Sequence, residues 1–257
     1  MNTIQELVKN NIVAFGLVTS AAWVVSSFVI ADGLSTINKR DTISVTGTSE
    51  RVVESDAAKW TLALNKNASE GEYSAVSKQL RSEVELVQKY LISQGIEEKN
   101  ITVQPLTSGV ICQSQSQVMY DGNGKQQCSG YFTYTLKQIV IVESDDVKRV
   151  RELSLNAENA LSVKGLQIQT VSVDYFYTKL ADIRVEMLSL ASKNAKERAV
   201  AIAKSTGDSI GGVKDASQGV FQVTQKNSTD VSDYGSYDTS TIEKKVTAIV
   251  RASFTVE

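Results

Sequence analysis

The spacing of apolar residues predicts a series of strands and helices beyond residue 41. Residues 42–51 and 58–68 are predicted to be two strands, paired as a hairpin or lying side by side, because Trp60, Leu62 and Leu64 alternate onto one face. Ser69 and Glu72 form a capping box that begins a helix ending at Gly95. Its apolar positions recur every three or four residues: Tyr73, Val76, Leu80, Val84, Val87 and Leu91. A repeat this short favours a helix that covers a sheet over a coiled-coil seam.

The middle of the chain predicts strands at 101–111 and 131–142, separated by a turn at Asn123-Gly124. Ser144, Asp145 and Asp146 are expected to cap a second helix that ends near Leu161. A strand at 166–177 should follow. One of its faces carries Val171, Val173, Tyr175 and Tyr177.

The last third predicts a long helix over 180–205, ended by Gly207, then a strand at 220–223 and an exposed loop over 227–241. The helix has an apolar stripe in which alanines predict close packing: Leu180, Ile183, Met187, Leu190, Ala191, Ala195 and Ile202. The clearest strand is the final one, with Val246, Ala248, Val250, Ala252, Phe254 and Val256 on one face. The order of elements predicts an α+β fold with mainly antiparallel or mixed sheets and packed helices.

Residues 12–31 form a run of 20 without a charged side chain, which is the length that crosses a bilayer core. Three interpretations are open: an uncleaved signal anchor, a cleavable signal peptide with Val29 and Ala31 before the cut, and a buried core helix. The length of the run favours the anchor, that is, one transmembrane helix. The flanking charges do not set its orientation.

Composition excludes several classes of function. The formal net charge is −2, so we expect no nucleic-acid partner. The chain has no histidine, which removes serine triads, Cys-His dyads and His-containing zinc sites. We therefore predict no catalytic, cofactor-binding or metal-binding residues.

The two cysteines, Cys112 and Cys128, favour a disulfide, because a zinc site would need carboxylates to complete its ligands. They are not placed symmetrically about Asn123-Gly124, so a bridge would pin an irregular loop. Such a loop would stabilise the fold by about 3 kcal/mol in the chain-entropy model. Two buried free thiols are the alternative. A disulfide and an export-type N-terminus place the folded part in a periplasm or extracellular space.

Five short segments stand out along the chain: Ile43 to Gly47, Ser55-Asp56-Ala57, Gly95 to Ile101, Ser129-Gly130-Tyr131 and the alanine-rich helix that runs to Gly207. Together they resemble the SIMPL-domain family, long catalogued as a domain of unknown function. The order and spacing of these segments carry the resemblance, which covers residues 42–257. The chain departs from the family near Ser49, where a glycine is usual, and at Ser55, where a proline is usual.

The resemblance implies an α+β bacterial envelope protein that is periplasmic or membrane-anchored. At least one relative in that family resembles a ring-like or barrel-like homo-oligomer. It implies no catalytic residues. We expect residues 1–11 to be a short cytoplasmic N-terminus, 12–31 the signal anchor, 32–41 a linker and 42–257 a SIMPL-like domain.

Other polar clusters have ordinary structural explanations. Asp121 to Gly124 lacks the spacing of a calcium loop and predicts a turn. Helix capping and a solvated helix face explain two pairs of acids, Asp145-Asp146 and Asp182-Glu186. Tyr175, Tyr177, Tyr234 and Tyr237 are candidates for a binding or subunit surface. Glycosylation sequons begin at Asn67, Asn100 and Asn227, where chance is the default explanation.

These observations favour a membrane-anchored, non-enzymatic envelope protein that forms a homo-oligomer through its sheet edges and long helices. The alternative is a ligand-binding or sensor module acting through a membrane partner, in which the loops at 112–128 and 227–241 close over an unidentified ligand. An enzyme would have to rely on carboxylates, lysine or tyrosine alone.

Overall fold

The computed structural model describes residues 23–31, 42–114, 118–124, 126–229, 232 and 234–257. Residues 12–22 of the predicted membrane segment, like the predicted tail and linker, lie outside this part. Residues 23–31 are helical and exposed. No helix in the described part is both long and apolar enough to cross a membrane.

The chain forms two units. One contains the described residues of 1–49, 188–219 and 249–257, and the other contains those of 50–187 and 220–248. Strands β1 (Thr42–Glu54) and β11 (Glu243–Val256) and helix α4 (Leu180–Thr206) contribute residues to both units. The α+β class is confirmed, and the sheets are antiparallel.

The second unit contains a five-stranded sheet with the order β3-β7-β2-β8, and β4 also pairs with β7. Its strands are β2 (Ala57–Ala68), β3 (Ile101–Val103), β4 (Thr107–Cys112), β7 (Phe132–Ser144) and β8 (Gln169–Phe176). The predicted face of β2 is the core face, since Trp60, Leu62 and Leu64 are fully buried.

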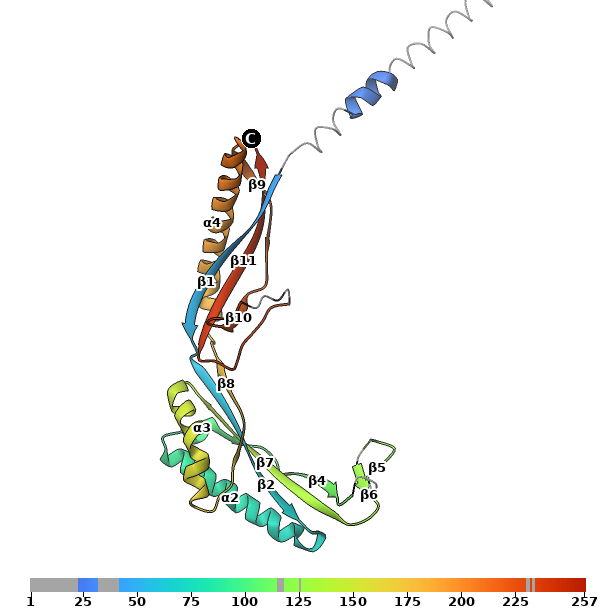
Figure 1. Ribbon diagram of the computed structural model, residues 1–257, viewed down its shortest axis with the longest axis vertical. Helices are drawn as coiled ribbons and strands as arrows, with labels where there is room; N and C mark the ends of the chain where they lie inside the picture. The colour runs from blue at the N-terminus through green and yellow to red at the C-terminus, as the bar shows by residue number, and fades with distance from the viewer. Residues whose placement is uncertain (1–22, 32–41, 115–117, 125, 230–231, 233) are drawn as a thin grey trace, which may run out of the picture. The chain divides into compact units, whose positions relative to one another are not determined.

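Two helices, α2 (Tyr73–Ser93) and α3 (Val147–Ser162), pack against this sheet (Figure 1). Short 3-10 helices lie at Glu70–Glu72 and Glu98–Asn100. The predicted capping box is present, because the Ser69 amide and hydroxyl both donate to the Glu72 carboxylate. Helix α2 buries Leu80, Val84, Val87 and Leu91 against the core. The prediction that it covers a sheet is confirmed.

The expected pairing of the first two strands is wrong. β1 belongs to the sheet of β11 and β10 (Gln222–Gln225), whereas β2 belongs to the five-stranded sheet. The chain changes sheet at Ser55, whose amide and hydroxyl both donate to the Ile242 carbonyl at 2.9 Å. Proline, which is usual here in the family that the sequence resembles, has neither of these donors.

Two predicted strands also differ in detail. The strand expected over 101–111 is interrupted at Pro105, which has no amide to donate to a sheet. In β8, Thr61 faces Ser172 while Leu62 faces Thr170, so Val171 is an extra, bulged residue. Its side chain is 52% exposed, and the expected continuous apolar face of this strand is therefore wrong at Val171.

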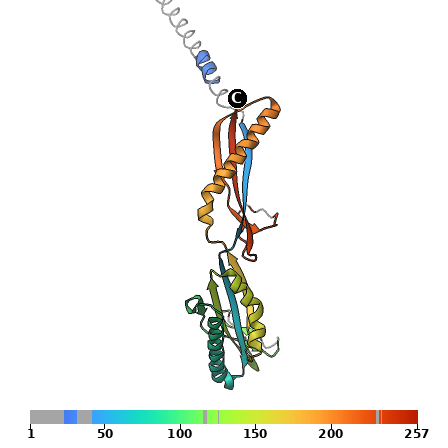
Figure 2. The same ribbon diagram turned by 90° about the vertical axis from the view of Figure 1, so that its left-hand side faces the viewer.

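In the first unit, α4 lies along β1 and β11, as Figures 1 and 2 both show. The helix buries four alanines spaced four residues apart: Ala191, Ala195, Ala199 and Ala203. It also buries Met187, which belongs to the second unit. Leu190 and Ile202, expected in the stripe, are 48% and 45% exposed.

The backbones of β1 and α4 approach closely at Gly47. A methyl group on Gly47 would lie 2.1 Å from the Ala191 carbonyl oxygen and 2.3 Å from the Ala195 nitrogen. Only small side chains fit such a contact, which explains why alanines rather than Leu190 and Ile202 face the strand. The predicted close packing is confirmed, although the width of the apolar stripe was not predicted correctly.

β11 also pairs with β9 (Ile210–Gln218), a strand that the apolar pattern did not predict. Most of β9 is exposed, and its register with β11 shifts twice. The final strand itself is confirmed, with Val246 and Ala248 fully buried.

Candidate functional site

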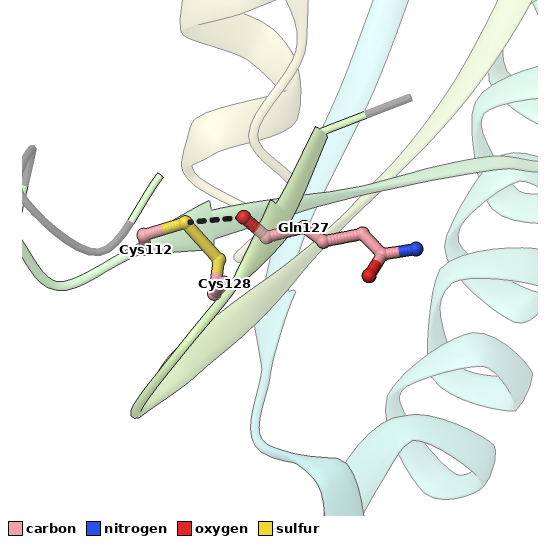
Figure 3. Close-up of a disulfide and its surroundings, with 3 residues drawn as sticks. All are labelled: Cys112, Gln127 and Cys128. Carbon is pink, nitrogen blue, oxygen red and sulfur yellow. Dashed lines mark hydrogen bonds between the residues drawn. A yellow bond between two sulfur atoms is a disulfide. The ribbon is translucent and has the colours of Figure 1, made fainter. Parts of the chain in front are cut away.

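Cys112, at the end of β4, and Cys128, at the end of β6 (Gln126–Cys128), form a disulfide (Figure 3). Their Cα atoms are 5.5 Å apart. The Cys112 sulfur also lies 3.7 Å from the Gln127 carbonyl oxygen. Because this sulfur is in a disulfide, it has no hydrogen to donate, and the contact is not a hydrogen bond. The bridge ties the end of β4 to the hairpin that follows it.

That hairpin pairs β5 (Val118–Tyr120) with β6. The Asn123 amide donates to the Asp121 carboxylate at 3.0 Å, and the Gly124 amide donates to the Asp121 carbonyl at 2.9 Å. Gly124 has a φ of 76°, which glycine adopts readily. These bonds confirm the turn predicted at residues 121–124 and give Asp121 a structural role there.

Large apolar side chains around the disulfide face solvent. Ile111 is 54% exposed, Met119 51%, Tyr120 69% and Tyr131 81%, and we call these four residues the hairpin surface. Residues 107–136 include only two charged side chains, Asp121 and Lys125. Exposed apolar side chains in a segment with few charges are typical of a binding surface.

A polar cluster lies at the other end of the five-stranded sheet, next to β8. Lys244 is completely buried and donates to the Asp238 carbonyl at 2.6 Å and to its carboxylate at 3.1 Å. The same carboxylate accepts hydrogen bonds from the amides and hydroxyls of Ser240 and Thr241. The segment around Asp238 is thereby folded into a fixed shape.

Burial alone would raise the pKa of Asp238. The hydrogen bonds from Ser240, Thr241 and Lys244 outweigh it and hold this pKa well below its usual range. Asp238 is therefore ionised at neutral pH, and its oxygens are occupied as hydrogen-bond acceptors. It is poorly suited to give or take a proton in catalysis.

The segment around Asp238 forms one wall of a pocket of about 670 Å³, which we call the α3 pocket. Helix α3 supplies Lys148 and Arg151, and β8 supplies Tyr175. The other lining residues are Glu54, Gln225, Lys226, Asn227, Ser240, Thr241, Ile242 and Glu243. Tyr175 is 8% exposed, and burial raises the pKa of its phenol despite the opposing effect of Arg151. Its hydroxyl therefore keeps its proton at neutral pH.

The four candidate tyrosines have different environments. Tyr175 lines the α3 pocket, whereas the Tyr237 hydroxyl accepts from the Tyr177 amide and donates to the Tyr177 carbonyl. Tyr234 is 98% exposed. They do not form one surface.

The acidic pairs have structural contacts. Asp146 caps α3 by accepting from the Arg149 amide at 2.9 Å, and Glu186 forms an ion pair with Arg51. Within the described residues, no group of three or more Cys, Asp or Glu side chains could hold a metal ion.

Sequence reasoning missed Lys244 and the two α3 cations. Lys244 has the same strand parity as Val246 and Ala248, so the alternation does indicate that its side chain points inward. Nothing in the local pattern places residues 240–243 beside α3, because that contact depends on tertiary structure.

The described parts of the loops at 112–128 and 227–241 lie at opposite ends of the sheet. The first begins opposite Phe132, next to the Ala68–Tyr134 pair, and the second bonds to Tyr175, which is opposite Ala58. Ala68 lies ten residues after Ala58 along β2, a distance of about 33 Å. One small ligand cannot contact both loops.

These features define an α+β protein with two antiparallel sheets, alanine-mediated packing of a long helix and a disulfide-linked hairpin. The SIMPL family model, described as a protein of unknown function (DUF541), matches residues 43–254. The chain belongs to the SIMPL family. No curated protein matches it.

Proposed function

We propose that the protein is a membrane-anchored envelope protein that acts by binding rather than by catalysis, and that it assembles into a homo-oligomer. The apolar run over residues 12–31 supports the anchor. The Cys112–Cys128 disulfide supports an oxidising location for the folded part, a periplasm or extracellular space.

The observation that carries the assembly proposal is the hairpin surface. Ile111, Met119, Tyr120 and Tyr131 are exposed within a segment that has almost no charge. Tyrosine and methionine are enriched, and charged residues depleted, in the centres of protein interfaces. The sparse charge favours a second copy of the same surface as the partner, because two such surfaces meet without like-charge repulsion.

The strands at the edges of the first unit's sheet are less suited to self-association. On β1, the Thr46 carbonyl accepts from Arg198 at 2.8 Å, and the Thr48 amide donates to Asn194 at 3.2 Å. On β9, the pairing with β11 contains two register shifts, and the strand carries Lys214. Both features protect an edge strand from pairing with another chain. We therefore assign assembly to the hairpin surface rather than to the sheet edges that the sequence favoured.

The test is the mass of the full-length protein in detergent, measured by light scattering beside intact-protein mass spectrometry. We expect a discrete multimer that retains residues 1–31. The double variant Y120S/Y131S should lower the mass toward that of a monomer, because buried tyrosines often carry much of an interface's binding energy. Y234S is the matched control, since Tyr234 is also an exposed tyrosine, at 98%, but lies outside the hairpin surface.

Each result has a separate meaning. A wild-type monomer at tens of micromolar would contradict assembly. A multimer unchanged by Y120S/Y131S would contradict the hairpin surface as its interface. Loss of the N-terminal residues from the purified protein would contradict the anchor.

A ligand-binding role is the second candidate, and the α3 pocket is the observation that favours it. In that case we propose that it signals through a membrane protein as partner.

A further inference from the structure

The first five residues of α3 have an unusual charge pattern for a helix N-terminus. They include Lys148, Arg149 and Arg151, and the first turn has no acidic residue. The N-terminus of a helix has a positive partial charge, so cations there are unfavourable and anions favourable. Asp146, the N-cap, offsets only part of this positive charge.

Two of these three cationic side chains have no partner within the described part of the chain. Arg149 donates to the Gln94 carbonyl and forms an ion pair with Glu152. Across the described residues, the side chains of Lys148 and Arg151 form neither a hydrogen bond nor an ion pair. Both line the α3 pocket, where Lys226 is already paired with Glu243 at 2.9 Å.

The part of the pocket wall formed by residues 240–243 is preorganised. Ser240 and Thr241 are fixed by the Asp238 carboxylate, which the buried Lys244 holds in turn. The Tyr175 amide donates to the Thr239 carbonyl at 2.7 Å, which ties this wall to β8. A pocket whose wall is already ordered loses little conformational entropy when a ligand binds.

We infer that the α3 pocket binds the carboxylate or phosphate group of a small anionic molecule, held by Arg151 and Lys148 and by a hydrogen bond from the Tyr175 hydroxyl. Arginine offers a planar pair of donors that matches either oxyanion, and lysine adds a second charge. Glu54 and Glu243 also line the pocket, so a ligand that is neutral or positive away from its oxyanion fits better than a polyanion. This inference rests on the ligand-binding candidate and is independent of assembly.

The test uses the full-length protein in nanodiscs of phosphatidylcholine, titrated with inorganic phosphate and separately with acetate by calorimetry. Sodium chloride at matched ionic strength is the reference, since exposed charges are screened by salt. We expect at least one probe to bind above this reference. K148Q/R151Q should weaken that binding about tenfold or more, and Y175F about threefold, as charge-assisted and neutral hydrogen bonds are lost.

K193Q/K196Q is the matched control, because it removes two charges three residues apart on α4, outside the pocket. It should leave binding unchanged. No binding of either probe, or equal binding by K148Q/R151Q and the control, would overturn the inference.

A second arm adds phosphatidylglycerol vesicles to distinguish a lipid headgroup from a free oxyanion. Binding of free probe that vesicles do not displace supports a soluble ligand. Displacement by vesicles identifies the phosphate of a lipid headgroup as the ligand. Light scattering on the same samples reports the oligomer separately, so loss of ligand binding and loss of assembly are distinguishable.

Discussion

Gly47→Ala adds a single methyl group, yet the structure predicts a large loss of stability. The added methyl group would lie 2.1 Å from the Ala191 oxygen, 2.3 Å from the Ala195 nitrogen and 2.7 Å from the Ala195 methyl. Two of these atoms belong to the backbone of α4, so no side-chain rotation relieves the clash. β1 and α4 must separate.

Separation weakens the hydrogen bonds that join Asn194 to Thr48 and Arg198 to Thr46. Overpacking costs about 1–3 kcal/mol, and the backbone clash places Gly47→Ala at the upper end. For a protein of this size, a loss of about 3 kcal/mol lowers the melting temperature by about 6–12 °C. The measurement is urea and thermal unfolding of the full-length protein by circular dichroism.

Gly109→Ala is the matched control. Gly109 also lies in a strand, but a methyl group there meets nothing within 4 Å. Removing backbone freedom from the unfolded chain should make this variant equal to the wild type or more stable by about 0.4–1 kcal/mol. Adding Ala195→Gly to Gly47→Ala should not restore stability, because both backbone contacts remain. Equal stability of Gly47→Ala and Gly109→Ala would refute the reasoning.

Three further predictions concern the second unit. Lys244→Met should lower the free energy of unfolding by about 3–5 kcal/mol in urea titrations, since it leaves Asp238 without its buried cation. The double variant Lys244→Met/Asp238→Asn should lose less unfolding free energy than the sum of the two single variants. Because the pKa of Asp238 is lowered in the folded state, its stabilisation is fully present above the unfolded pKa of about 3.9 and is lost as pH falls through the lower folded value. The wild type should therefore lose more stability than Asp238→Asn between about pH 5 and 2, and parallel curves would contradict this. The Cys112→Ala/Cys128→Ala variant should lose about 3 kcal/mol and gain protease cleavage between residues 112 and 128, which peptide mass mapping would detect.

Much of the fold could be predicted where side chains report burial directly. β11 and β2 alternate apolar and polar residues because one face of each is in a core, and α2 has a stripe at helical spacing for the same reason. β9 could not be found this way. Its sequence, IGGVKDASQ, has no alternation, and it is a strand because its backbone pairs with β11.

The assignment of strands to sheets depends on long-range contacts. β1 and β2 are separated by two residues, yet belong to different sheets, because Ser55 bonds to Ile242, almost 190 positions later. The disulfide was favoured from composition alone. The α3 pocket was not predictable, since its walls come from residues near 150, 175 and 240.

The two candidate surfaces can be tested separately because of their positions on one sheet. The hairpin surface adjoins the end of β2 near Ala68, and the α3 pocket adjoins the end near Ala58, about 33 Å away. Substitutions this far apart, with no shared partner, have additive effects unless the sites are coupled. K148Q/R151Q should therefore leave the oligomer mass unchanged, and Y120S/Y131S should leave oxyanion affinity unchanged. A change in both properties in either variant would mean that assembly and ligand binding are linked, with the sheet and its two helices as the structure between them.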